Sequence, residues 1–262
     1  MTRRGRLFLS ALAGLLYGTA AAQAADPKCA VPRETYAFSK PLPVSSARVI
    51  QGQPLKVVAI GSSTTQGAGV DDPAASYPAR LEMELLRRLP GVTVEVVNQG
   101  VSGQLARQMV DRFEEDVIEE KPALVVWQTG LNDVVAAVDV DDFRQTLTEG
   151  VKQLQAAGID VILMDLQYYP NSTQFADYDD YLAAMQSVAD ETGAALFHRF
   201  ASMKHLLKDL RRRSGGLMSS NLFAMMDLNY RCVPLLLADA VFEKLHEALF
   251  ATGNLSPNVQ KK

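Results

Sequence analysis

Apolar residues in this chain fall into short continuous runs separated by longer stretches with helical periodicity. The short runs are rich in branched apolar side chains and are bounded by Gly, Asn and Asp, which is typical of strands buried on both faces. They predict strands at residues 55–60, 93–98, 124–128, 161–165 and 195–197. Parallel strands need crossover connections, so this alternation predicts a mainly parallel sheet with helices on both faces.

Apolar positions three and four residues apart predict the intervening helices. In the first, Ser76 is a suitable N-cap, Leu81, Leu85 and Leu89 share one face, and Pro90 ends the helix. The others are expected at residues 105–119, 142–157, 177–192 and 234–250. A basic cluster at residues 204–213 is expected at a solvated helix end.

The pattern predicts a single domain at residues 55–251, built as a three-layer α/β/α sandwich of the flavodoxin-like type. A length of 262 residues with 48% hydrophobic residues suits a single core. Residues 25–54 are rich in proline and lack clear periodicity, so we expect a lead-in over the surface. Residues 252–262 are expected to form a C-terminal tail.

The first 24 residues have the pattern of a secretory signal peptide. Arg3, Arg4 and Arg6 precede an apolar run at 7–22, and small residues lead to a cleavage site after Ala24. The run is too short for a convincing membrane span. We therefore expect an exported protein, either periplasmic or secreted.

Charge and cysteine content narrow the classes of partner. Removing the leader leaves 23 basic and 30 acidic residues, a net charge of about −7, which gives no support for nucleic-acid binding. Cys29 and Cys232 are expected either to form a disulfide or to remain as two buried thiols. No Cys/His cluster has metal-ligand spacing, so neither a metal nor a cofactor is expected. The sequence carries no signal for an oligomeric state.

Each of the first three predicted strands runs into a turn rich in small and polar residues. Ligands of parallel sheets bind beyond the carboxyl ends of the strands, where all three turns should meet. Serine in such a turn is a nucleophile only if a base takes its proton and donors stabilise the oxyanion. The turns cover residues 61–67, 98–103 and 129–133.

In order and composition, the three turns resemble the first three sequence blocks of the SGNH (GDSL-type) hydrolases. The resemblance implies that Ser63 is the nucleophile, and that the Gly103 N–H and the Asn132 side chain donate to the oxyanion. Ser62 stands where the family usually has the aspartate of Gly-Asp-Ser. The resemblance implies hydrolysis of a carboxylic ester, on a small molecule or an acetylated glycan.

The fourth family block, Asp-x-x-His, is degenerate in this chain. Family spacing places Asn221 at the acid position and Ala224 at the histidine position. A shifted register would use Asp227 as the acid and put Tyr230 where histidine belongs; we prefer the first because it preserves the step into the last helix. Neither register supplies an imidazole, and His198, after the fifth strand, is a possible substitute.

Two functions therefore remain open: a weak or unconventional esterase, and a non-catalytic protein that binds a ligand or glycan on the same fold. A nucleotide binder is disfavoured, because no Gly-x-Gly-x-x-Gly or lysine-bearing phosphate loop follows a strand. Tyr168 and Tyr169 are expected either to stack on a sugar or acyl group or to pack under their own loop. Asn171 begins a short glycosylation-type sequon.

Overall fold

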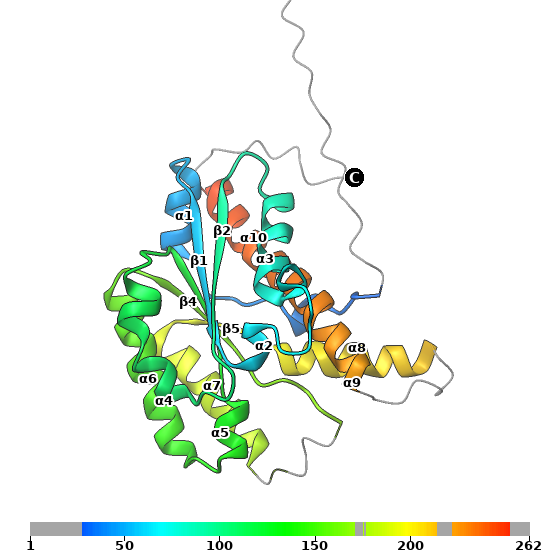
Figure 1. Ribbon diagram of the computed structural model, residues 1–262. Helices are drawn as coiled ribbons and strands as arrows, with labels where there is room; N and C mark the ends of the chain where they lie inside the picture. The colour runs from blue at the N-terminus through cyan, green and yellow to red at the C-terminus, as the bar shows by residue number, and fades with distance from the viewer. Residues whose placement is uncertain (1–27, 171–174, 176, 214–221, 252–262) are drawn as a thin grey trace, which may run out of the picture.

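The computed structural model describes residues 28–170, 175, 177–213 and 222–251. Its centre is a parallel five-stranded sheet in the order β2-β1-β3-β4-β5 (Figure 1). The strands are β1 (Leu55–Gly61), β2 (Val94–Gly100), β3 (Leu124–Gln128), β4 (Asp160–Met164) and β5 (Ala195–Phe197). All five predicted strands are confirmed with shifts of one or two residues at some ends, as is the α/β sandwich.

Helices cover both faces of the sheet and bury a separate apolar cluster on each (Figure 1). Alternate residues of β1 supply both: Val57 and Ala59 to one cluster, Val58 and Ile60 to the other. The first face carries α1 (Pro43–Ile50), α3 (Tyr77–Arg88), α8 (Arg199–Arg213) and α10 (Val233–Ala251). The second carries α4 (Ala106–Val110), α6 (Val140–Ala156) and α7 (Tyr178–Thr192).

Short elements complete the described chain. The α-helical ones are α2 (Ser63–Gln66), α5 (Leu131–Val135) and α9 (Leu222–Asp227). Single 3₁₀ turns are η1 (Arg33–Thr35) and η2 (Pro73–Ala75), and π-helical turns are η3 (Glu114–Ile118) and η5 (Leu228–Cys232). In the part of the chain that is described, no helix has the length and apolarity needed to cross a bilayer.

The single helix predicted at 105–119 is wrong, because α4 ends at Val110 and the π-helical turn η3 follows. Arg112 lies at the break, where its guanidinium donates to the Gln99 carbonyl and to the Gln104 side chain, each at 2.7 Å. Both acceptors lie in or after β2, so the break depends on a tertiary contact that apolar periodicity does not reveal.

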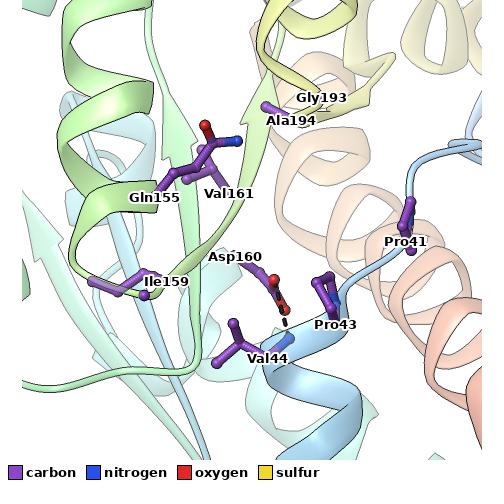
Figure 2. Close-up of a pocket in the computed structure, with 10 residues that line it drawn as sticks. Pro41, Pro43, Val44, Gln155, Ile159, Asp160, Val161, Gly193 and Ala194 are labelled. Carbon is purple, nitrogen blue, oxygen red and sulfur yellow. Dashed lines mark hydrogen bonds between the residues drawn. The ribbon is translucent and has the colours of Figure 1, made fainter.

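The lead-in also departs from expectation, since α1 forms within residues 25–54 and buries Leu42 and Val49 in the core. The Asp160 carboxylate holds the start of this helix by accepting from the backbone N–H groups of Ser45 (2.8 Å) and Val44 (3.3 Å). Figure 2 shows Asp160 facing Val44. Both residues line a hollow of about 250 Å³. This hollow lies at the amino ends of the strands, opposite the edge where parallel sheets bind ligands.

Cys29 and Cys232 form a disulfide that joins the N-terminal segment to η5, just before α10. Both cysteines are buried in the core, at 1% and 0% exposure. The disulfide alternative is therefore confirmed, and that of two buried thiols is wrong. The predicted signal peptide, the Asn171 sequon and the C-terminal tail lie outside the described residues.

Candidate functional site

The turns after β1 and β2 are held against each other at the carboxyl edge of the sheet. Gly61 and Gly100 are register partners, and the Val101 N–H donates to the Gly61 carbonyl at 3.0 Å. Helix α2 crosses the end of β2 so closely that a Cβ on Gly100 would lie 2.1 Å from the Gln66 nitrogen. Glycine at position 100 is therefore needed for α2 to sit where it does.

Ser63 is the first residue of α2, half-buried at the end of β1. The first N–H groups of a helix have no partner within the helix, and those of Ser63 and Thr64 donate to no described residue. No described side chain hydrogen-bonds to the Ser63 hydroxyl. Residue 63 thus presents a hydroxyl beside unused backbone donors.

Gln128, at the end of β3, organises this turn. Its side-chain oxygen accepts from the Ser62 N–H (3.1 Å), the Ser62 hydroxyl (3.3 Å), and the hydroxyls of Thr64 (2.9 Å) and Thr65 (3.0 Å). The residue is 1% exposed. Sequence reasoning placed Gln128 only at a strand end, and nothing in its local pattern revealed that it gathers four donors.

Replacing Gln128 with alanine should lower the free energy of unfolding by about 2–4 kcal/mol, because buried donors lose their common acceptor and a cavity opens. Urea unfolding would measure the change. The matched control is Gln155→Ala, whose exposed side chain donates to the Thr192 carbonyl and to no other described residue; it should cost less than about 1 kcal/mol. Equal losses in the two variants would contradict this role for Gln128.

The second and third predicted motifs are also brought together. Gly103 has φ +79°, and a Cβ there would meet nothing within 4 Å, so its backbone borders open space. No described residue accepts from the Gly103 N–H. The Asn132 amide donates to the Gln104 carbonyl at 2.8 Å, which fixes that side chain beside Gly103 and leaves its second hydrogen available.

The Asp133 carboxylate holds the third turn against α4 and is engaged in backbone hydrogen bonds. Its buried carboxylate accepts from the Ala106 N–H at 3.0 and 3.2 Å, so it caps the start of α4 from α5. Burial raises the pKa of this carboxyl, whereas the backbone hydrogen bonds lower it.

The fourth-block positions supply no base within the described residues. Asn221 lies outside them, and Ala224 is a residue of α9. Asp227 is mostly exposed and pairs with Arg231 at 2.8 Å. The Tyr230 hydroxyl donates to the Ala68 carbonyl at 2.7 Å, and burial raises the pKa of this phenol further from neutrality. Tyr230 therefore ties down the loop after α2.

His198 belongs to a different corner of the same edge. Its Nδ1 lies 3.6 Å from a carboxylate oxygen of Asp165, whose other oxygen accepts from the Phe200 N–H at 2.7 Å. β5 is three strand spacings from β1, or ~14 Å between backbones. Among the described residues, no hydrogen bond joins His198 to Ser63, and its role as a substitute base stays a prediction.

Arg199, the residue after His198, does cross the span and was missed from sequence. It is 1% exposed; its Nε donates to the Asp165 carbonyl at 3.0 Å, and its Nη1 lies 3.5 Å from the Thr64 hydroxyl. Its Nη2 is buried without a partner among the described residues. Burial lowers the pKa of the guanidinium, and the nearby Asp165 charge opposes that shift.

The two candidate aromatic residues after β4 contact other parts of the protein. Tyr168 packs edge-on against Phe200, with ring centroids 5.3 Å apart. Tyr169 is half-buried, and desolvation raises the pKa of its phenol. Packing of the described rings is thus observed, while stacking on a ligand remains a prediction.

A parallel sheet in this strand order, with α2, the Gly103 turn and α5 meeting at its carboxyl edge, defines an SGNH/GDSL-type hydrolase fold. Residues 28–247 match the model of the Non-GDSL lipase-like family, and the chain belongs to that family. Among solved structures it is similar to Axe2, an acetylxylan esterase from Geobacillus stearothermophilus. That match has a TM-score of 0.55 and 25% identity, covering 73% of this chain and 94% of the other.

Three curated relatives match this chain over part of their length, and two of them are named as esterases. The acetylxylan esterase of Geobacillus stearothermophilus is 30% identical over 134 residues, covering 46% of this chain and 61% of the relative. The esterase TesA of Pseudomonas aeruginosa is 30% identical over 115 residues, covering 44% and 56%. An uncharacterized lipoprotein, YqeF of Bacillus subtilis, is 30% identical over 115 residues, covering 41% and 46%. The chain thus matches less than two thirds of each.

Proposed function

We propose that this chain is an exported ester-binding protein whose Ser63 site hydrolyses carboxylic esters slowly. The observation that carries the proposal is the Ser63 hydroxyl, which lies beside unused backbone donors and has no proton acceptor among the described residues. Two relatives named as esterases, one of them for acetylxylan, support small acyl esters or acetylated glycans as substrates. The disulfide supports export, because such bonds persist in oxidising compartments.

The proposed chemistry follows from the donors. Ser63 Oγ attacks the ester carbonyl, and the oxyanion that develops accepts from the Ser63 N–H, the Gly103 N–H and the Asn132 amide. Serine hydrolases that lose triad members keep ~10³–10⁴-fold acceleration over water, from these donors and from binding. A rate of that order is what we expect here.

Purified mature protein should hydrolyse 4-nitrophenyl acetate slowly, and Ser63→Ala should remove the enzymatic part of that rate. The matched control is Ser187→Ala on α7, a serine whose hydroxyl bonds, among the described residues, to Glu191 and lies away from this edge. Release of nitrophenol would be followed against buffer alone. Equal rates for parent and Ser63→Ala would reject the proposed hydrolysis.

A second candidate is a non-catalytic protein that binds the same class of ligand. It is favoured by Asp227 and Tyr230, which are engaged in structural contacts instead of serving the nucleophile. Calorimetric binding of an acetylated xylo-oligosaccharide, without Ser63-dependent turnover, would support this function. Binding together with Ser63-dependent turnover would support the esterase.

A further inference from the structure

Arg199 is a cation held almost completely out of water, with one of its terminal nitrogens unsatisfied. It is 1% exposed, and its Nη2 has no partner among the described residues. Buried unpaired donors are rare, and burying an ion carries a large desolvation penalty. Tight packing alone does not require a charge at this position, since an apolar side chain of similar volume would fill it.

The two ends of the Arg199 side chain contact different groups. At one end, Nε binds the main-chain carbonyl of Asp165, whose carboxylate lies beside His198 and the start of α8. At the other end, Nη1 faces the Thr64 hydroxyl in α2, next to Ser63. Asp165 thus lies at the Nε end of the Arg199 side chain, and Nη1 of the guanidinium is directed toward the turn that carries Ser63.

The other titratable groups near Arg199 do not neutralise the charge of its guanidinium. They are phenols, and burial raises the pKa of each, so they are uncharged at neutral pH. These phenols belong to Tyr77, Tyr169, Tyr178 and Tyr230. Among the described groups that influence the guanidinium most strongly, Asp165 supplies the negative charge.

We propose that Arg199 is a positioning residue whose buried charge stabilises the anions that form at Ser63, in place of the missing imidazolium. The proposal rests on the function proposed above and assigns that site its source of positive charge. As Ser63 Oγ bonds to the carbonyl carbon, its proton passes to solvent hydroxide and the carbonyl electron pair moves to oxygen. Collapse expels the alkoxide, which takes a proton from water, and a second water then releases the acid from the acyl-serine.

The test is the rate at which a fluorophosphonate labels Ser63 in the mature, disulfide-bonded protein. The Ser63 oxygen displaces fluoride from phosphorus, so the reaction senses the same developing anion and needs no turnover. Arg199→Met should label about 10- to 100-fold more slowly, because a buried charge that reaches the residue next to Ser63 changes an ionisation there by that order at an effective dielectric near 20. Arg199→Lys, which keeps the charge, should recover most of the parent rate. Circular dichroism and urea unfolding confirm that each variant is folded.

Arg199→Gln serves if Arg199→Met does not fold. It keeps a polar group near the Thr64 hydroxyl and removes the charge, so labelling should slow by about the same 10- to 100-fold factor. Parent-like labelling of Arg199→Met or of Arg199→Gln, or equal slowing by Lys and Met, would each overturn the proposal. So would a parent protein that is not labelled at all. A labelled protein that hydrolyses no ester refutes the proposed function and leaves this inference standing.

Discussion

Combining Asn221→Asp with Ala224→His is expected to raise Ser63-dependent ester hydrolysis at least 100-fold. The sequence predicts that these positions correspond to the acid and the histidine of the family block. If so, an imidazole there would accept the serine proton while the carboxylate orients it. Triad members in serine hydrolases contribute factors of this size or larger beyond the oxyanion donors. Steady-state hydrolysis of 4-nitrophenyl acetate by parent and variant measures the gain.

Three controls show whether the gain comes from a rebuilt triad. Asn221→Asp alone should add nothing, because a carboxylate without an imidazole has no proton carrier to orient. Ala224→His alone should give part of the gain. Adding Ser63→Ala to the double variant should remove it. A folded double variant no faster than the parent would mean that the site differs from its family in more than the base.

Removing the disulfide with Cys29→Ser and Cys232→Ser together should lower the free energy of unfolding by about 5 kcal/mol. The bond joins residues 203 positions apart. In the chain-entropy model, closing a loop of that length restricts the unfolded chain by about 5 kcal/mol, and measured native disulfides generally contribute about 2–5 kcal/mol. Urea unfolding of the oxidised parent and the double variant measures the difference.

Dithiothreitol provides the matched comparison for this prediction. The reduced parent should unfold at the same urea concentration as the double variant, and the reductant should not change the variant. A loss below about 1 kcal/mol in the double variant would contradict the structural role given to this bond.

The sheet was predictable because its signals are local. Each buried strand is a continuous apolar run, and each of the three turns follows its strand directly, so the strand ends and the candidates Ser63, Gly103 and Asn132 could be located without tertiary information. The disulfide could be named only as one of two alternatives, since two cysteines do not reveal their own pairing.

The features that were missed depend on partners distant in the sequence. Helix α1 begins at Pro43 and is capped by Asp160, more than 100 residues later. Gln128 gathers donors from α2 and from Ser62 before it, across 63–66 residues, and Arg199 reaches Thr64 across 135. Short-range periodicity carries no information on such contacts. The side chains that hold the turn carrying Ser63 therefore became evident only in the structure.

The pH dependence of Ser63-dependent hydrolysis tests most directly whether that serine works without an imidazole. Because no histidine would share the proton transfer, the parent rate should rise about tenfold per pH unit from pH 5 to 9, with no inflection near the ordinary imidazole pKa of ~6.5. The Asn221→Asp/Ala224→His variant should show such an inflection. An inflection between pH 6 and 7 in the parent, abolished by His198→Ala, would contradict the account.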